Sequence, residues 1–207
     1  MRLILVRHGQ TTSNTGFLLD TAVPGANLTE LGRRQAEDLV ARLDEYPIAA
    51  IYASVLVRTQ QTAAPLAAKL GLPVTILEGL REISAGDDEM SADATNYINT
   101  MLAWRDGDLS ARVPGGESAV EFMMRYEGAI CQVAAAGHDV AVCFSHGAAT
   151  RTWSWARIRG FKEALGDGVL QNTGFVVADG DPVSGWDLVR LEGLNQRSGY
   201  LVDGQRV

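Results

Sequence analysis

Three short apolar runs along the chain indicate strands that are buried on both faces. Residues 3–6, 48–53 and 140–144 contain only aliphatic, aromatic or cysteine side chains, without the alternating polar positions of a half-exposed sheet. Continuous runs of this length are typical of parallel strands covered by helices on each side. We therefore predict three central strands of a parallel sheet.

Helical patterns lie between these runs. A segment that begins after Thr29, a suitable N-cap, places its apolar side chains on one helical face. The alanine-rich segment 58–70 ends at Gly71, a typical helix stop. Ser118 and Glu121 form a capping-box pair ahead of a long amphipathic pattern. We expect helices in all three places and a further one after Gly147.

The alternation of strands and helices predicts an α/β fold, a three-layer sandwich whose mostly parallel central sheet carries helices on both faces. Two late strands, at 174–178 and 186–191, are expected to pair at an edge of the sheet. The polar segment 83–116, rich in Asp and Gly, interrupts the alternation and contains one helical pattern, at 94–104. We interpret it as a small cap inserted into a single domain, residues 1–207.

Composition removes several classes of partner. The 207 residues are 46% hydrophobic and carry a formal net charge of -7 without a basic run, which argues against nucleic acid and anionic membranes. No apolar stretch approaches the roughly 20 residues of a spanning helix, and the first apolar run is too short for a signal peptide. Cys131 and Cys143 are expected to be reduced, buried thiols, so we predict a cytoplasmic protein. The final residues, from Asn195, are expected to form a loosely held tail.

Two His-Gly pairs follow two of the predicted strands, at His8-Gly9 and His146-Gly147. In an open α/β sheet, ligands bind beyond the carboxyl ends of the strands, so two imidazoles from different strands can share one pocket. The glycine after each histidine lets the backbone turn and approach a ligand closely. Arg7 also lies just past a strand end.

Arg7 and Arg58 are well suited to a phosphate ligand. Each follows a predicted strand, and the planar guanidinium group can bind phosphate oxygens through paired hydrogen bonds. Two arginines and two histidines would then surround one anion.

A series of ordered motifs resembles the histidine phosphatase (phosphoglycerate mutase-like) superfamily over residues 1–178. In chain order they are Arg7-His8-Gly9-Gln10-Thr11-Thr12-Ser13-Asn14, Leu28-Thr29-Glu30-Leu31-Gly32, Ser54-Val55-Leu56-Val57-Arg58-Thr59, Leu80-Arg81-Glu82-Ile83, Pro114-Gly115-Gly116-Glu117-Ser118 and Ser145-His146-Gly147. The resemblance implies a phosphomonoester hydrolase that acts through a phosphohistidine intermediate on a small phosphorylated metabolite.

The resemblance also implies roles for individual residues. His8 would take the phosphoryl group, and Glu82 would protonate the leaving alcohol and then activate water. No metal and no cofactor would be required. Glu82 has a second interpretation, as part of a structural salt bridge with a neighbour such as Arg81.

Four further residues would bind the substrate. Arg7, Arg58 and His146 would stabilise charge on the phosphoryl oxygens, with Asn14 and Gly147 as additional contacts. Asn14 can equally be only a turn residue.

The cap favours a phosphatase over a mutase. In the resembled family, phosphoglycerate mutases have a longer cap with clustered Arg and Lys that bind a second anionic group, whereas the only arginines of this cap are Arg105 and Arg112. Its six acidic residues are expected to repel a substrate with several anionic groups, which predicts a neutral leaving group; they are Asp87, Asp88, Glu89, Asp93, Asp106 and Asp108.

Other functions remain open at this point. The same pocket can serve mutase-type phosphotransfer, or a non-catalytic protein that binds a phosphorylated ligand. A metallohydrolase built on His8 and His146 is a third alternative, although arginines stand where an Asp or Glu ligand set would be needed. Trp153 and Trp155 are two positions apart on a predicted helix, so they cannot both face one core. One of them is therefore a candidate for the interface of a homodimer.

Overall fold

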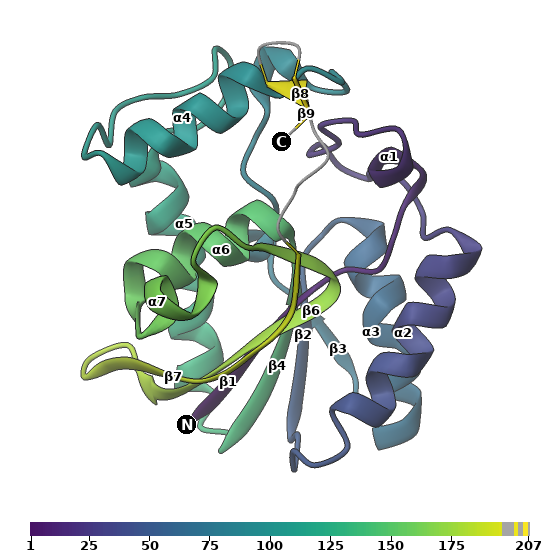
Figure 1. Ribbon diagram of the computed structural model, residues 1–207. Helices are drawn as coiled ribbons and strands as arrows, with labels where there is room; N and C mark the ends of the chain where they lie inside the picture. Colours follow the sequence, from purple (N-terminus) through teal and green to yellow (C-terminus); the bar gives the residue numbers. More distant parts are fainter. Residues whose placement is uncertain (196–200, 203–204, 207) are drawn as a thin grey trace.

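A seven-stranded sheet runs through the centre of the computed structural model (Figure 1), which describes residues 1–195 and the backbone of 201–202 and 205–206. The strand order is β3-β2-β4-β1-β6-β7-β5. The strands are β1 (Arg2–Arg7), β2 (Ala50–Ala53), β3 (Val74–Ile76), β4 (Val140–Ser145), β5 (Ile158–Arg159), β6 (Val169–Asp181) and β7 (Gly185–Asn195). The first four in this order are parallel, and β6 is antiparallel to both β1 and β7.

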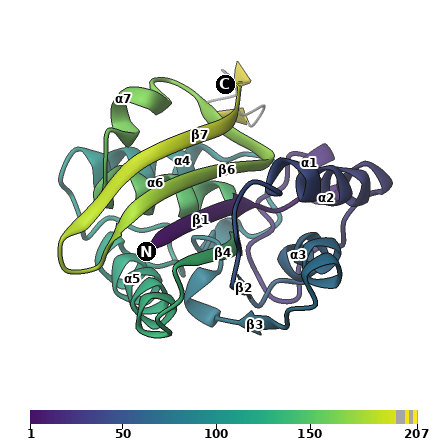
Figure 2. The same cartoon turned by 90° about the horizontal axis from the view of Figure 1, so that it is seen from below.

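Helices cover both faces of the sheet, as Figure 2 shows from below. They are α1 (Thr12–Thr15), α2 (Glu30–Arg42), α3 (Val57–Leu70), α4 (Thr95–Arg105), α5 (Ala119–Ala135), α6 (Gly147–Arg157) and α7 (Phe161–Leu165). Ile4 and Val6 pack with α2 and α3, whereas Leu3 and Leu5 pack with the helices on the other face. The predicted α/β sandwich is therefore confirmed, and burial on both faces explains why this strand has no polar positions.

The three central strands were predicted correctly, with one shift. β2 begins at Ala50, two residues later than expected, because the Ile48 N–H bonds to the Tyr46 carbonyl at 2.8 Å in a turn.

The helix boundaries follow the local signals. Thr29 caps α2 by accepting a hydrogen bond from the Gly32 amide, and Ser118 and Glu121 form the reciprocal capping box of α5. Gly71 ends α3 with a φ of 67°. The caps satisfy amides that a helix leaves unpaired at its start.

The two late strands pair with each other, but the expected edge position is wrong for β6. It lies between β1 and β7, and Phe175, Val176 and Val177 on it are fully buried. The edge is instead the two-residue strand β5, which the sequence pattern did not indicate.

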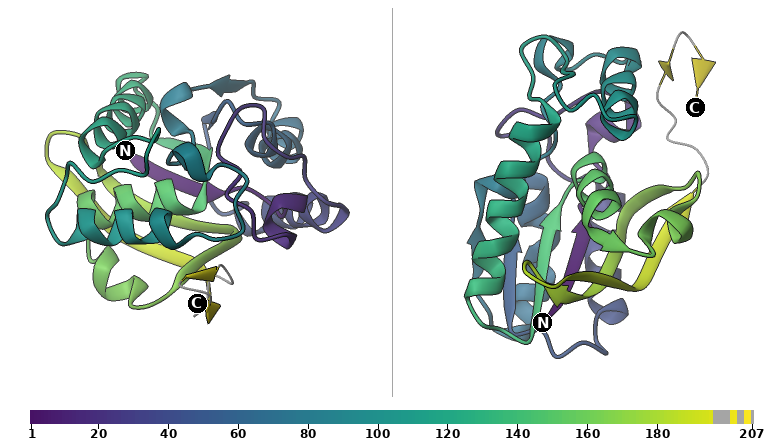
Figure 3. Two further views of the ribbon diagram at one scale, coloured as in Figure 1. Left: turned by 90° about the horizontal axis from the view of Figure 1, so that it is seen from above. Right: turned by 90° about the vertical axis from the view of Figure 1, so that its left-hand side faces the viewer.

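The segment 83–116 contains a short 3-10 turn (Gly86–Asp88) and α4. Figures 1 and 3 show α4 beyond the carboxyl ends of β1 and β4. Trp104 of α4 stacks on Phe122 of α5 with ring centroids 6.0 Å apart, and the Tyr97 hydroxyl donates to the Ile83 carbonyl at 3.0 Å. These contacts hold the segment over the sheet.

Two expectations about the chain's chemistry are modified. Both cysteines are free, but Cys131 is exposed because it lies on the outer face of α5, so only Cys143 is a buried thiol.

The predicted tail from Asn195 lies mostly outside the described residues, apart from Asn195 in β7 and the backbone of β8 (Leu201–Val202) and β9 (Gln205–Arg206). Among the residues that the structure describes, no helix is long and apolar enough to cross a membrane.

Replacement of Gly32 by alanine should destabilise the protein, because an added Cβ would lie 2.1 Å from the Gln10 carbonyl oxygen. We expect the free energy of unfolding to fall by about 3 kcal/mol. Gly128→Ala is the matched control, since Gly128 also lies in a helix but its Cβ would meet nothing within 4 Å. This control should be more stable by about 0.5 to 1 kcal/mol. Urea unfolding of both variants tests the difference, and equal stabilities would contradict it.

Candidate active site

The pairing of β1 with β4 brings the two predicted histidines together. The strands are parallel with Arg7 opposite Ser145, and each histidine directly follows its strand. The two rings meet edge to face with centroids 5.3 Å apart. Both imidazoles are almost completely buried.

His8 presents a nitrogen lone pair to its neighbours. Arg58 Nε donates to His8 Nε2 at 3.1 Å, and His8 Nδ1 lies 2.7 Å from the Gly9 carbonyl oxygen. Because a guanidinium group only donates, Nε2 must be the unprotonated nitrogen, and Nδ1 carries the proton that bonds to Gly9. Burial, followed by the charges of Arg58 and Arg7, holds the pKa of His8 well below its usual value. His8 is therefore a neutral imidazole with its lone pair on Nε2.

The loop that carries His8 is held tightly against α2 and α3. The Gly9 amide donates to Thr62 Oγ1 at 3.0 Å, and a Cβ on Gly9 would lie 2.6 Å from the Gly32 carbonyl oxygen. Only glycine permits this approach, so the turn fixes the position of the preceding imidazole.

Arg58 is anchored at the start of α3 by a buried carboxylate. Its Nη2 donates to the Asp20 carbonyl at 2.7 Å, and its Nη1 lies 3.5 Å from the Asp20 carboxylate. Asp20 in turn accepts from Ser13 Oγ at 2.7 Å and from the Ala26 amide at 2.9 Å. The ion pair leaves the guanidinium edge directed toward His8.

Arg7 lies across the second His-Gly turn. Its Nη1 donates to the Leu170 carbonyl at 2.5 Å. A Cβ on Gly147 would lie 3.2 Å from Arg7 Nε, so glycine at this position leaves room for the guanidinium group.

His146 has one occupied and one unoccupied nitrogen. Its Nε2 lies 2.8 Å from Ser54 Oγ, whereas its buried Nδ1 has no hydrogen-bond partner among the described residues. Burial and the charge of Arg58 lower the pKa of His146 well below its usual value. An unsatisfied buried nitrogen is unfavourable. A bound oxyanion would satisfy it by accepting a hydrogen bond from a protonated Nδ1, or by donating one through a protonated oxygen to an unprotonated Nδ1.

The Glu82 carboxylate is held by the start of α6. Its oxygens accept from the amides of Ala148 at 3.1 Å, Ala149 at 2.7 Å and Ile83 at 2.9 Å. No ion pair with Arg81 is present among the described residues, so the interpretation as a salt bridge with this neighbour is not supported. The carboxylate thus has one defined orientation beside the second His-Gly turn.

Arg125 on α5 supports the segment before Glu82. Its guanidinium group donates to the carbonyls of Gly79, Arg81 and Glu82 at 2.9 Å each, and it is paired with Glu117 at 2.6 Å. No sequence motif pointed to this arginine, because its partners are backbone carbonyls about 45 residues away.

Asn14 has the structural role that the turn interpretation predicted. Its Oδ1 accepts from the Thr11 amide at 3.1 Å and completes the capping box of α1. Asn172 Nδ2 also donates to this oxygen at 3.1 Å, and donates to the His8 carbonyl at 3.0 Å. These bonds fix the orientation of the Asn14 amide at the cavity wall.

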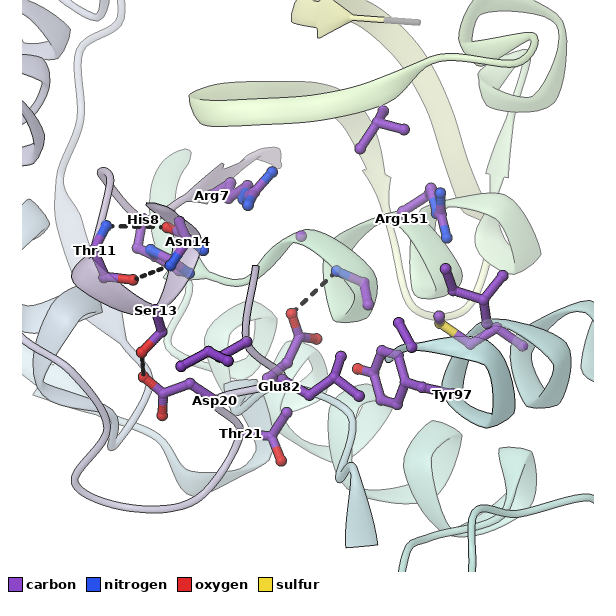
Figure 4. A pocket seen from close by; sticks show the side chains of 18 of the residues that line it. Arg7, His8, Thr11, Ser13, Asn14, Asp20, Thr21, Glu82, Tyr97 and Arg151 are labelled. Atoms are coloured by element: carbon purple, nitrogen blue, oxygen red, sulfur yellow. Dashed lines mark hydrogen bonds between the residues drawn. The ribbon is translucent and has the colours of Figure 1, made fainter. Parts of the chain in front are cut away.

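These side chains surround one cavity of about 260 Å³ (Figure 4). Most predicted site residues line it: Arg7, His8, Asn14, Arg58, Glu82 and Gly147. His146 is not among the residues that line this cavity, but its ring is in contact with that of His8, which is.

The cavity also contains residues that the sequence analysis missed. Asp20, Tyr97 and Arg151 line it, and Figure 4 shows Arg151 on the side opposite His8. A signal for Arg151 existed, since it follows Gly147 by four residues in a predicted helix and so shares its face. Asp20 lies in an irregular loop, where spacing carries no such information.

The acidic side chains of the cap do not line the cavity. None of the six acidic residues between 87 and 108 is part of its wall, and their expected repulsion of an anionic substrate near the entrance stays a prediction. Within the described part of the chain, no group of three His, Cys, Asp or Glu side chains is arranged to hold a metal ion. The pair of histidines is instead surrounded by arginines.

Comparison with known proteins decides the family. A sequence model of the histidine phosphatase superfamily (branch 1) matches residues 3–192. The chain belongs to the histidine phosphatase superfamily.

Relatives in this superfamily differ in length and in name. The chain is 36% identical to the PE-PGRS family protein PE_PGRS11 of Mycobacterium tuberculosis over 91% of its own length, but it spans only 36% of that protein. It is 35% identical to a probable phosphoglycerate mutase GpmB of Proteus mirabilis, over 72% of this chain and 71% of the relative.

Solved histidine phosphatase structures show the same fold. A mycobacterial glucosyl-3-phosphoglycerate phosphatase, solved as a complex with VO3, superimposes with a TM-score of 0.76 at 28% identity, over 93% of this chain and 98% of that one. A putative alpha-ribazole-5'-P phosphatase from Escherichia coli gives a TM-score of 0.73 at 26% identity, with coverages of 95% and 97%.

The lowered pKa values of His8 and His146 predict that this histidine phosphatase loses stability between about pH 7.5 and pH 5. The unfolded chain binds protons on these imidazoles below about pH 6.5, while the folded protein resists them, so the free energy of unfolding falls as pH falls. The loss is up to about 2 kcal/mol for each histidine by pH 5.

Urea unfolding across this pH range measures the effect. His8→Asn and His146→Asn should each flatten the pH dependence, and His138→Asn, outside the site, should leave it unchanged. A pH dependence that is the same in all three variants would show that neither imidazole is held neutral.

Proposed function

We propose that this chain is a metal-independent phosphomonoester hydrolase that acts through a phosphohistidine at His8 on a small phosphorylated metabolite. The observation that carries the proposal is the state of His8, a neutral imidazole whose Nε2 lone pair is directed to an arginine in a cavity with two further arginines. A nucleophile of this kind can attack the phosphorus atom of a phosphate ester whose oxygens are bound by the arginines.

The first step is transfer of the phosphoryl group to His8. The phosphate would take the place of the Arg58 contact at Nε2, and Nε2 would form a bond to phosphorus while the bond to the leaving oxygen breaks. Glu82 would donate a proton to that oxygen. Arg7, Arg58 and the unpaired Nδ1 of His146 would stabilise the charge on the phosphoryl oxygens.

The second step regenerates the enzyme. Glu82, now ionised, would accept a proton from a water molecule that attacks phosphorus, and the electron pair of the P–N bond would return to His8 Nε2. The products are inorganic phosphate and the free alcohol. The three amides hold the Glu82 carboxylate in one orientation, and the proposal uses the same carboxyl group in both steps.

Hydrolysis is favoured over mutase-type transfer by the cap. Arg112 pairs with Glu121 at 3.2 Å, and Arg105 lies over the Trp155 ring at 3.9 Å. Neither lines the cavity, so the cap supplies no cationic cluster to hold a second phosphorylated substrate. The names of the structural neighbours agree with hydrolysis, whereas the GpmB name of one relative keeps the mutase as the second candidate. A non-catalytic protein that only binds a phosphorylated ligand would not need the oriented Glu82 carboxylate, because a carboxylate does not favour the binding of an anion.

Replacement of His8 by alanine should abolish phosphate release. With a panel that contains 4-nitrophenyl phosphate and the substrates named for the two structural neighbours, we expect wild type to release phosphate in excess chelator, and His8→Ala to be slower by at least about a thousandfold. His138→Ala is the matched control and should retain full activity.

Three results would contradict this proposal in different ways. Equal activity of wild type and His8→Ala would remove His8 from the reaction. Loss of wild-type activity in chelator would indicate a metal-dependent hydrolase. Exchange of phosphate between two substrates without net release would indicate a mutase.

A further inference from the structure

Strand β6 has an irregular segment next to His8. Its pairing with β7 shifts register between Leu170 and Phe175, while Phe175 pairs with Val6 of β1. Because β1 and β6 are antiparallel, the residue that comes opposite His8 is Thr173. The Thr173 amide accordingly donates to the His8 carbonyl at 3.3 Å. The irregular segment therefore contacts the backbone of His8 directly.

Thr173 has a backbone conformation that is unfavourable for its residue type. Its φ is 56°, in the left-handed region, where a β-branched residue is strained. Its hydroxyl donates to the Asn172 carbonyl at 2.7 Å and accepts from Arg42 Nη1 at 3.3 Å. Arg42 is in turn held by Glu192 at 2.7 Å. The surrounding contacts thus hold a strained turn, and this turn carries the Asn172 side chain to the end of β1.

The Asn172 side chain bridges two parts of the cavity wall. Its Nδ2 donates to the His8 carbonyl at 3.0 Å and to Asn14 Oδ1 at 3.1 Å. A backbone carbonyl only accepts, so the nitrogen of the Asn172 amide must face His8. The same nitrogen then requires an acceptor at Asn14, and the Thr11 amide requires one there too, at 3.1 Å.

The Asn14 amide therefore has one favourable orientation. Its oxygen faces two donors, which leaves its nitrogen for the cavity that Asn14 lines (Figure 4). An amide nitrogen can donate to a phosphoryl oxygen, whereas a flipped amide would present an oxygen that repels it.

We propose that Asn172 is a positioning residue for phosphoryl transfer, which fixes the His8 peptide and keeps the amide nitrogen of Asn14 toward the phosphoryl oxygens. This inference rests on the proposed function for the place of the phosphoryl group. Asn172 does not line the cavity, so its effect passes through His8 and Asn14. Fixed donors stabilise the transition state more than the bound substrate, so loss of Asn172 should slow the reaction more than it weakens binding.

A burst experiment separates positioning from folding. In the Glu82→Gln background with saturating 4-nitrophenyl phosphate, the burst amplitude counts intact sites and the burst rate reports transfer to His8. We expect Asn172→Ala to lower the burst rate by about thirtyfold and to keep an amplitude of about one per protein. A purely structural role would lower the amplitude and leave the rate unchanged, which would overturn the proposal.

The neighbouring Gln171 supplies the matched control. It lies in the same irregular segment, but its side-chain amide makes only a 3.5 Å hydrogen bond to the Val169 carbonyl. Gln171→Ala should therefore change neither the amplitude nor the rate of the burst.

Asn172→Asp tests whether the donor itself matters, and it preserves the side-chain volume if Asn172→Ala does not fold. An ionised carboxylate offers only oxygens to the His8 carbonyl and Asn14 Oδ1, so at about pH 8 this variant should be at least as slow as Asn172→Ala. Protonation restores one donor, so the ratio of the two burst rates should rise in favour of Asn172→Asp toward about pH 5.5. A ratio that does not change with pH would contradict a role as donor.

Binding of vanadate tests the assignment without turnover. Vanadate can adopt the five-coordinate geometry of phosphoryl transfer, and inorganic phosphate serves as the ground-state comparison. By calorimetric titration with His8 and Glu82 intact, we expect Asn172→Ala to bind vanadate about thirtyfold more weakly and phosphate within about threefold of wild type. An equal loss for both anions, or no loss for vanadate, would overturn the proposal.

These measurements distinguish a failure of this inference from a failure of the proposed function. If Glu82→Gln with Asn172 intact gives no burst, the hydrolase mechanism is contradicted, and the vanadate titration still decides the role of Asn172. A normal burst whose rate is the same in Asn172→Ala would overturn the positioning role alone.

Discussion

The parallel pairing of β1 with β4 is the constraint on which the site depends. Because Arg7 lies opposite Ser145 in this register, the residues that follow are His8 and His146, and their rings are brought into contact beyond the sheet. A shift of one residue would turn one imidazole to the other face of the sheet. The burial of both strands on both faces fixes this register, so the hydrophobic core directly determines the geometry of the histidine pair.

Charge compensation explains the rest of the cavity. Burial, followed by the charges of Arg58 and Arg7, keeps His8 neutral. Arg58 is held by Asp20, and Arg7 by a backbone carbonyl. Glu82 is stabilised by the amides at the start of α6 and not by a cation, so it does not neutralise the arginines of the cavity. The cavity wall therefore carries Arg7, Arg58 and Arg151 beside a neutral imidazole.

The sequence predicted features that arise from local patterns. Strand burial, helix caps such as Thr29, and the residues that directly follow β1 and β4 were all correct, because each depends on neighbouring residues and on the general topology of α/β sheets. It did not predict Asp20, Arg125 or the interior position of β6. Asp20 and Arg125 act through contacts with distant backbone or loop segments, and the order of strands in a sheet depends on long-range packing.

The most direct test of the account is a pre-steady-state experiment with Glu82→Gln and 4-nitrophenyl phosphate. Nitrophenolate leaves without a proton, so the first step should proceed in this variant, while the second lacks its base. The account predicts a burst of about one nitrophenolate per active site, with the phosphoryl group retained on His8 and detected by phosphorus NMR after alkaline quench. Release of nitrophenolate and phosphate in step, with no burst and no phosphohistidine, would contradict a mechanism through His8.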